Sequence, residues 1–306
     1  MSRYPGVFPP VLESFCPTFS PGPTDRPWVS KDALVSALPA SEDVLIRFCC
    51  HIADTLHHSS IKVYLSAIRS LHIEEGLPSP LVGCLRLQRV LLGIKRHEGS
   101  NRRQHQPITI ELMHIIFQSL NFSDYDHTML WTACSLGFFG VLRAVEFTVN
   151  SPFNSDIHLA VSDVQADSLV NPGSFRIHIK CSKTDPFRQG CHIYIGAGKR
   201  DLCPVRALTQ YLHVRGSTPG PLFLLSDGTP LHRQWLTSSI QSIFSAAGVT
   251  GCYTGHSFRI GAATSAASRG LPDHLIKTLG RWSSDAYQIY IHTPVSTIVG
   301  VASLLT

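Results

Sequence analysis

Apolar residues recur with a helical period over residues 40–94. The apolar positions of "SSIKVYLSAIRSLHIEEG" fall on one helix face: Ile61, Leu65, Ile68 and either Leu71 or His72. Such a stripe predicts an amphipathic helix that buries one side. The stretch "SEDVLIRFCCHIADTL" and residues 81–94 have similar spacing, so we predict a compact all-helical unit.

The period of the pattern changes after residue 150. In "SFRIHIKCS", Phe175, Ile177 and Ile179 alternate with polar residues, which predicts a strand. "HLAVSDVQ" and "CHIYIG" predict two more strands, and "KTDPFRQG" a turn between the last two. Helical spacing starts at residue 107, continues as a long helix to about Glu146, and resumes at "CPVRALTQYLHVRG". The pattern therefore predicts a mainly α fold with a small antiparallel β-sheet (α+β).

Composition divides the chain into four segments. Residues 1–28 are rich in proline and serine and predict an unstructured leader. Residues 29–96 are the helical domain, residues 97–106 a basic linker, and residues 107–306 a larger domain that contains the sheet. A chain of 306 residues is long enough for such a division and for a sizeable core.

The positive charge of the chain is concentrated in one segment. Six basic residues against Glu98 give residues 86–105 a net charge of +5, which equals the formal charge of the whole chain. A solvated basic linker and a track for a phosphate backbone both fit this pattern. The basic residues that we consider as DNA contacts, here and in the preceding helix, are Lys62, Arg69, Arg86, Arg89, Lys95, Arg96, Arg102 and Arg103.

Several function classes lack support. The nine cysteines have no C-x-x-C spacing and no secretory h-region opens the chain, so we expect reduced thiols. The longest apolar run, residues 128–142, is too short to span a bilayer. No P-loop, G-x-G-x-x-G or H-E-x-x-H motif is present, which argues against nucleotide hydrolysis and zinc proteolysis.

The stretch "GHSFRIGAATSAASRGLPDHLIKTLGRWSSDAYQIY" at residues 255–290 combines polar tips with many small residues. His256 and Arg259 are three positions apart and therefore share a helix face. The glycines and alanines that follow them allow another backbone or a bulky group to approach closely. H-x-x-R alone is usually a surface pair, but Trp282 and Tyr290 at regular positions downstream weaken that interpretation.

This stretch resembles the C-terminal box of tyrosine recombinases (the phage-integrase family), where H-x-x-R is followed by a His or Trp and then by a nucleophilic Tyr. His256 and Trp282 are 26 residues apart, as in the family's pattern. Trp282 and Tyr290 are 8 apart, one fewer than the usual 9. Tyr287 therefore stays open as a second candidate nucleophile, with Tyr290 favoured.

The resemblance requires two upstream elements, and both are present in order. "GFFGVLRAVEF" supplies Arg143 on the predicted helix with Glu146 three residues later, although an ordinary intrahelical pair would look the same. "KCSKTDPFRQG" supplies Lys183 in the predicted turn, with Lys180 as the substitute. The match covers residues 107–294, and the helical unit before it resembles the family's core-binding domain.

The resemblance implies transesterification of DNA without a metal ion, cofactor or ATP. Tyr290 is expected to attack the phosphodiester and form a 3′-phosphotyrosyl intermediate. Arg143 and Arg259 are expected to bind the non-bridging oxygens, because guanidinium matches phosphate in a bidentate way. Lys183 is expected to protonate the leaving 5′ oxygen, and His256 to assist proton transfer at the tyrosine. Trp282 is expected to donate its indole N–H to the phosphate, and Glu146 to orient neighbouring side chains.

The expected partner is double-stranded DNA, held between the two domains. Four copies of the protein are expected to assemble on two duplexes, and no association with a membrane is expected. The sequence "RIGAATSAASRGLPDHLIKTLGRWSS" is especially similar to the recombinases of eukaryotic DIRS and Ngaro-type retrotransposons and of Cryptons. That likeness implies a mobile-element origin, and a nuclear location for a eukaryotic protein or a cytoplasmic one otherwise. Two alternatives remain: a type IB topoisomerase, and a domesticated DNA-binding protein that no longer cuts.

Overall fold

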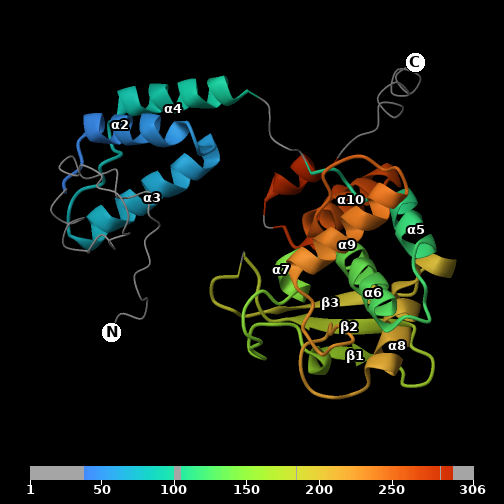
Figure 1. Ribbon diagram of the computed structural model, residues 1–306. Coiled ribbons are helices and arrows are strands. Elements are labelled where there is room, and N and C mark those ends of the chain that lie inside the picture. The colour runs from blue at the N-terminus through green and yellow to red at the C-terminus, as the bar shows by residue number, and fades with distance from the viewer. Residues whose placement is uncertain (1–37, 100–104, 184, 283, 292–306) are drawn as a thin grey trace. The chain divides into compact units, whose positions relative to one another are not determined.

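The computed structural model describes residues 38–99, 105–183, 185–282 and 284–291, and it divides the chain into two compact units (Figure 1). The first unit ends at Arg102 and the second begins at Arg103, within the stretch predicted as a linker. The predicted leader, residues 1–28, lies outside the described residues.

Within residues 38–99, the first unit has the helices α2 (Glu42–Ala53), α3 (His58–Glu74) and α4 (Leu85–Glu98). The predicted face of α3 is buried, and both Leu71 and His72 belong to it. His72 is fully buried, and both nitrogens of its imidazole have partners. Nε2 accepts the backbone N–H of Ala40 at 3.0 Å, and Nδ1 lies 2.8 Å from the carbonyl of Ile68. Helix α4 extends through Glu98, so the predicted linker begins with helical residues.

The second unit is built around α6 (Tyr125–Phe139), which is buried along most of its length and packs most extensively against α8 (Pro204–Arg215) and α10 (Gly255–Ser268) (Figure 1). The other helices pack around this centre. They are α5 (Ile110–Gln118), α7 (Ala144–Phe147), α9 (Arg233–Ala246) and α11 (Asp273–Gly280), with short 3₁₀ turns η2 (Val161–Asp163), η3 (Arg200–Leu202) and η4 (Asp285–Tyr290).

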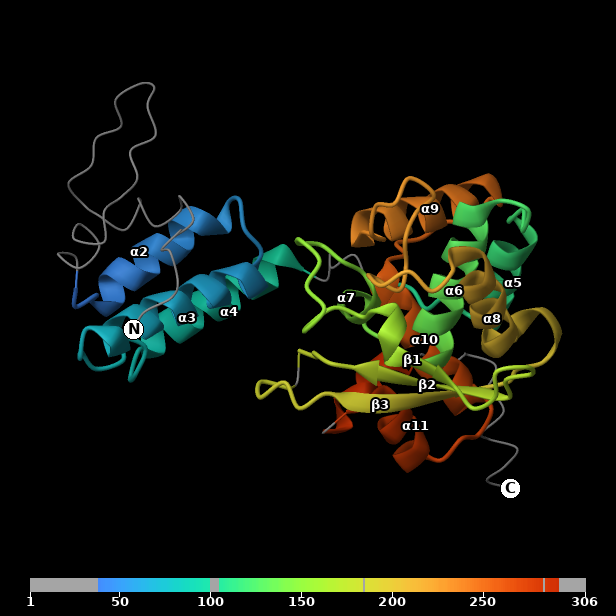
Figure 2. The same cartoon turned by 90° about the horizontal axis from the view of Figure 1, so that it is seen from below.

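Three antiparallel strands form the sheet in the order β1 (Val164–Ala166), β2 (Ser174–Ile179) and β3 (Cys191–Gly196) (Figure 2). The alternation in β2 is confirmed, because Phe175, Ile177 and Ile179 are buried in the same core as α6. The predicted turn joins β2 to β3. The prediction of a mainly α fold with a small antiparallel sheet is therefore confirmed.

The prediction of one long helix to Glu146 was wrong. Helix α6 ends at Phe139, and Val141 takes a left-handed backbone conformation with a φ of 48°. The chain then runs extended through Arg143, which is the N-cap residue of the separate helix α7. Arg143 therefore lies at a helix start instead of within a helix, and Glu146 lies in the first turn of α7.

The small residues of α10 permit a close backbone contact. A Cβ atom at Gly261 would lie 1.8 Å from the carbonyl oxygen of Ile108, so only glycine fits here without a backbone shift. We expect Gly261→Ala to lower the free energy of unfolding by about 2 kcal/mol, the usual range for overpacking a core. Calorimetry of the full chain measures this change.

The matched control is Gly93→Ala, the same exchange in the middle of α4, where a Cβ would meet no atom within 4 Å. This variant is expected to be stabilised by about 0.5 kcal/mol, because alanine is the better helix former. Equal effects of the two exchanges would contradict the close contact between α10 and Ile108.

Candidate active site

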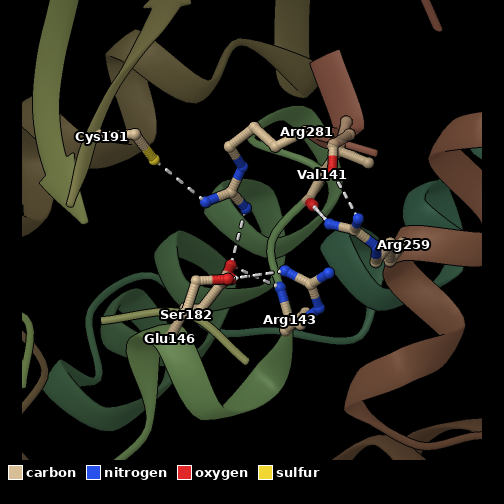
Figure 3. Close-up of polar contacts among 8 residues, drawn as sticks. Val141, Arg143, Glu146, Ser182, Cys191, Arg259 and Arg281 are labelled. Atoms are coloured by element: carbon tan, nitrogen blue, oxygen red, sulfur yellow. Dashed lines mark hydrogen bonds and ion pairs between the residues drawn. The ribbon is translucent and has the colours of Figure 1, made fainter. Parts of the chain in front are cut away.

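Arg259 connects the loop before Arg143 to the end of α11, just before Trp282. It projects from α10 and is only 1 % exposed. Its guanidinium donates to the carbonyl of Val141, two residues before Arg143, and to the carbonyl of Gly280 at the end of α11 (Figure 3). One side chain therefore fixes the positions of two segments that are far apart in sequence.

Arg143 is held by the first turn of its own helix and by the hairpin. Its Nη1 donates to Glu146 Oε1 at 3.0 Å and to the hydroxyl of Ser182 at 2.9 Å. Its backbone N–H donates to Glu146 Oε2 at 2.9 Å. The two side-chain contacts fix the direction of the guanidinium (Figure 3), and the side chain of Arg143 is 17 % exposed.

Arg281 is the third arginine of the group, and it was not among the residues predicted for the site. Its Nη2 donates to Glu146 Oε2 at 2.7 Å, and its Nη1 lies 3.6 Å from the sulfur of Cys191 in β3. The carboxylate of Glu146 therefore lies between Arg143 and Arg281, as Figure 3 shows. Arg281 stands nine residues before Tyr290, the distance at which the pattern of tyrosine recombinases usually has its His or Trp, and that count was the available signal.

Electrostatics set the protonation of the two central titratable groups. Burial raises the pKa of Glu146, but the charges and hydrogen bonds of Arg281 and Arg143 outweigh it and hold the pKa below its ordinary value. Burial lowers the pKa of His256, and Arg259, His105 and Arg143 lower it further. At neutral pH Glu146 is therefore ionised and His256 is a neutral imidazole that can accept a proton.

The two candidate lysines of the hairpin differ in surroundings. Lys180 is bound to Asp163 Oδ2 at 2.5 Å and to the backbone carbonyls of Ser155 and His158 at 2.6 Å and 3.2 Å. Lys183 lies exposed in the turn that follows β2, one residue after Ser182. The surroundings favour Lys183 as the lysine that can reach a ligand, because Lys180 is already held in a structural ion pair.

Trp282 packs against the arginine that the sequence pattern pairs with it. The Cζ of Arg259 lies 4.2 Å from the centroid of the indole ring, a cation–π contact. A Cβ at Gly280 would lie 1.7 Å from the same ring, so the glycine makes room for it. Trp282 thus covers Arg259, a contact that the sequence did not predict.

The two candidate tyrosines lie in η4. Tyr287 is 3 % exposed and packs with Ala263, Ile276 and Trp282, whose ring centroid is 5.9 Å from its own. The backbone of Tyr290 ends η4, and its side chain lies outside what the structure describes. The burial of Tyr287 counts against it as a residue that meets DNA.

The predicted DNA-contacting residues of the first unit are on the surface. Those that the structure describes are all exposed: Lys62, Arg69, Arg86, Arg89, Lys95 and Arg96. Arg86 forms a surface ion pair with Asp43 at 2.8 Å. Arg102 and Arg103 lie outside the described residues.

Metal and membrane features are not found in the part of the chain that the structure describes. No group of three or more His, Cys, Asp or Glu residues there is arranged to hold a metal ion. Likewise, no helix within the described ranges combines the length and apolar character needed to cross a membrane.

We expect Glu146→Gln to destabilise the protein by about 3 kcal/mol at pH 7, because loss of one partner leaves buried charges unpaired. The folded-state pKa of Glu146 lies below the ordinary value of 4.5 for a glutamate. The stability it contributes is therefore complete above that value and is lost as the pH falls through the folded-state pKa. Urea unfolding from pH 7 to pH 3 should show the difference between variant and wild type shrinking.

The control is Asp285→Asn, which breaks an ion pair of a carboxylate that is 72 % exposed. Its effect should stay below about 0.5 kcal/mol at every pH, as for most surface pairs. A Glu146→Gln effect independent of pH would mean that this carboxylate is not ionised in the folded protein.

Comparison with known proteins gives similarities in sequence and in fold. No family model matches the chain. The integrase/recombinase xerD homolog of Selenomonas ruminantium is 24% identical over 248 residues, covering 78% of this chain and 69% of that protein. The XerH site-specific recombinase, solved bound to its palindromic difH substrate, matches with a TM-score of 0.62 at 17% identity, over 87% of this chain and 70% of that one.

The integrase of the Tn1549 transposon, solved in complex with circular intermediate DNA, matches with a TM-score of 0.54 at 12% identity, over 86% of this chain and 85% of that one. The fold of the second unit is thus that of tyrosine recombinase catalytic domains. In sequence the chain is similar to an integrase/recombinase, and in fold it is similar to tyrosine recombinases.

Proposed function

We propose that the protein cleaves and rejoins duplex DNA through a phosphotyrosyl intermediate and so carries out site-specific recombination. One observation supports this function above the others. Arg143, Arg259 and Arg281 come from three segments, and their hydrogen bonds join the loop before α7, the turn after β2 and the end of α11; among the described residues, one carboxylate, that of Glu146, lies between two of them. Three fixed guanidiniums against one carboxylate leave the excess positive charge that a phosphodiester requires.

The reaction uses the phenol of Tyr290 as the nucleophile and releases the 5′ oxygen of the broken strand. Arg143 faces the phosphate, oriented by Glu146 and Ser182. Neutral His256 accepts the proton of the phenol, and exposed Lys183 protonates the leaving oxygen. Arg259 lies deeper and holds the two loops in position, with Trp282 over its face.

The phosphotyrosyl bond keeps the energy of the broken phosphodiester, so rejoining proceeds without ATP or a metal ion. The basic surface of the first unit binds the DNA backbone, which contributes salt-sensitive affinity without sequence information. The XerH recombinase and the Tn1549 integrase were both solved as DNA complexes, which supports DNA as the partner. By analogy, four protomers join two duplexes during strand exchange.

The origin that we propose is a eukaryotic mobile element of the DIRS, Ngaro or Crypton type, acting in the nucleus. This origin is supported by the resemblance of residues 259–284 to the recombinases of those elements. The transposon integrase among the structural relatives agrees with a mobile element in general terms only.

The test is to incubate the full chain with a nicked suicide substrate from a candidate element terminus and to analyse the products on a denaturing gel. A covalent protein–DNA band supports the proposal, and strand exchange between two such substrates identifies a recombinase. Relaxation of supercoiled plasmid without exchange would identify a type IB topoisomerase. Salt-sensitive binding with no covalent band would identify a DNA-binding protein that no longer cuts.

A further inference from the structure

We propose that Arg281 is a positioning residue of this site, which holds Glu146 in common with Arg143 and keeps the group of charges positive. The inference rests on the proposed function. It concerns a residue that the H-x-x-R, Trp and Tyr pattern leaves out.

The first support is the way in which Glu146 is shared. Its Oε1 accepts from Arg143 Nη1, whereas its Oε2 accepts from the Arg143 backbone N–H at 2.9 Å and from Arg281 Nη2 at 2.7 Å. The carboxylate is fully buried, so its direction depends on these donors. Arg281 holds the side of the carboxylate that Arg143 reaches only through its backbone.

The second support is the charge of the group. Arg143 and Glu146 alone form a neutral pair, which would attract a phosphodiester weakly. Arg281 adds a second guanidinium to the same carboxylate, and Arg259 adds a third to the site. The excess of two positive charges matches the two negative charges of the pentavalent phosphorane, while the ground-state phosphodiester carries one. The arrangement therefore favours the transition state over the bound substrate.

The third support is that stability alone does not favour arginine at this position. Arg281 has a left-handed backbone with φ 56° and ψ 43°, a conformation that suits glycine. Its Nε is buried and has no acceptor among the described residues. The backbone at this position lets two successive side chains reach different partners. Arg281 bonds to Glu146, and the next residue, Trp282, packs on Arg259.

Arg281→Gln tests the inference, with Arg281→Lys as the conservative variant. Lys277→Gln is the matched control, since it removes a positive charge from α11, the helix that Arg281 follows. Among the described residues, the ammonium of Lys277 binds only the exposed carboxylate of Asp285. We expect Arg281→Gln to slow formation of the covalent adduct about 100-fold, as for loss of one preorganised donor. Arg281→Lys should restore part of the rate, and Lys277→Gln should change it by less than about threefold.

A double-mutant cycle with Glu146→Gln separates positioning from a general structural role. If Arg281 acts through Glu146, Arg281→Gln should add less than about threefold to the loss already caused by Glu146→Gln. Equal losses in both backgrounds, or an unchanged rate in the single variant, would overturn the inference.

The same cycle has a readout that needs no activity. The charged groups that act on Glu146 are Arg281 and Arg143. Arg281 in turn reaches the thiol of Cys191, and the charge of Arg143 acts on the imidazole of His256. Arg281→Gln should destabilise the protein most at pH 7 and less as Glu146 is protonated at low pH, and this pH dependence should vanish in Glu146→Gln. If the wild type forms no adduct, the proposed function fails, and this coupling alone decides the inference. A destabilisation independent of Glu146 would contradict it.

Discussion

Replacing Tyr290 by phenylalanine is expected to abolish the covalent protein–DNA complex and to leave folding and DNA binding unchanged. The exchange removes one oxygen, which is the atom that forms the phosphotyrosyl bond. Tyr290 ends η4, which follows the loop of Gly280, Arg281 and Trp282 that Arg259 and Glu146 hold. Denaturing gels measure the adduct, and salt titration of DNA binding shows whether the variant still engages its substrate.

The matched variant is Tyr287→Phe, three residues earlier in the same 3₁₀ helix. The Tyr287 ring packs against Ala263 and Ile276, and phenylalanine keeps that packing. We expect the adduct to persist, because a side chain that is 3 % exposed is poorly placed to reach DNA. Loss of the adduct in Tyr287→Phe but not in Tyr290→Phe would reverse the assignment.

Arg143→Gln has the second largest expected effect, a fall of about 10³-fold in the rate of adduct formation. Arg143 is partly exposed, and Glu146 and Ser182 fix its guanidinium from two directions. Glutamine can occupy the space but supplies neither the charge nor the bidentate geometry. Single-turnover rates on the suicide substrate measure the loss at the chemical step.

Arg143→Lys should recover little of this rate, because a single ammonium cannot bind two phosphate oxygens in a planar fork. The control is Arg206→Gln in α8, where an exposed arginine pairs with Asp201 at 3.3 Å. Its rate should stay within about threefold of wild type, as expected for a surface pair. A comparable loss in both variants would show that overall charge, and not the site, controls the reaction.

Much of the fold could be predicted from local patterns, because burial leaves a periodic trace in sequence. The alternation of β2 and the face of α3 are examples. The break between α6 and α7 left no such trace. "GFFGVLRAVEF" consists mostly of residues that helices accept, and the break is held by tertiary contacts, including the bond from Arg259 to the carbonyl of Val141.

The site was predictable to the extent that its residues follow a linear motif. His256 and Arg259 share α10 as expected. The pair of Glu146 and Arg281 joins positions 135 residues apart, and no local pattern reports such a contact. Likewise, the packing of Trp282 on Arg259 depends on how the chain turns after Gly280. Arg281 has a left-handed backbone conformation there, which the presence of an arginine does not predict.

The most direct measurement is the identity of the residue that carries DNA after cleavage. The full chain is trapped on the suicide substrate, digested with nuclease and protease, and the peptides are sequenced by mass spectrometry. The account predicts a nucleotide linked through its 3′ phosphate to Tyr290. A nucleotide on Tyr287, a 5′ linkage, or no modified peptide despite DNA binding would contradict it.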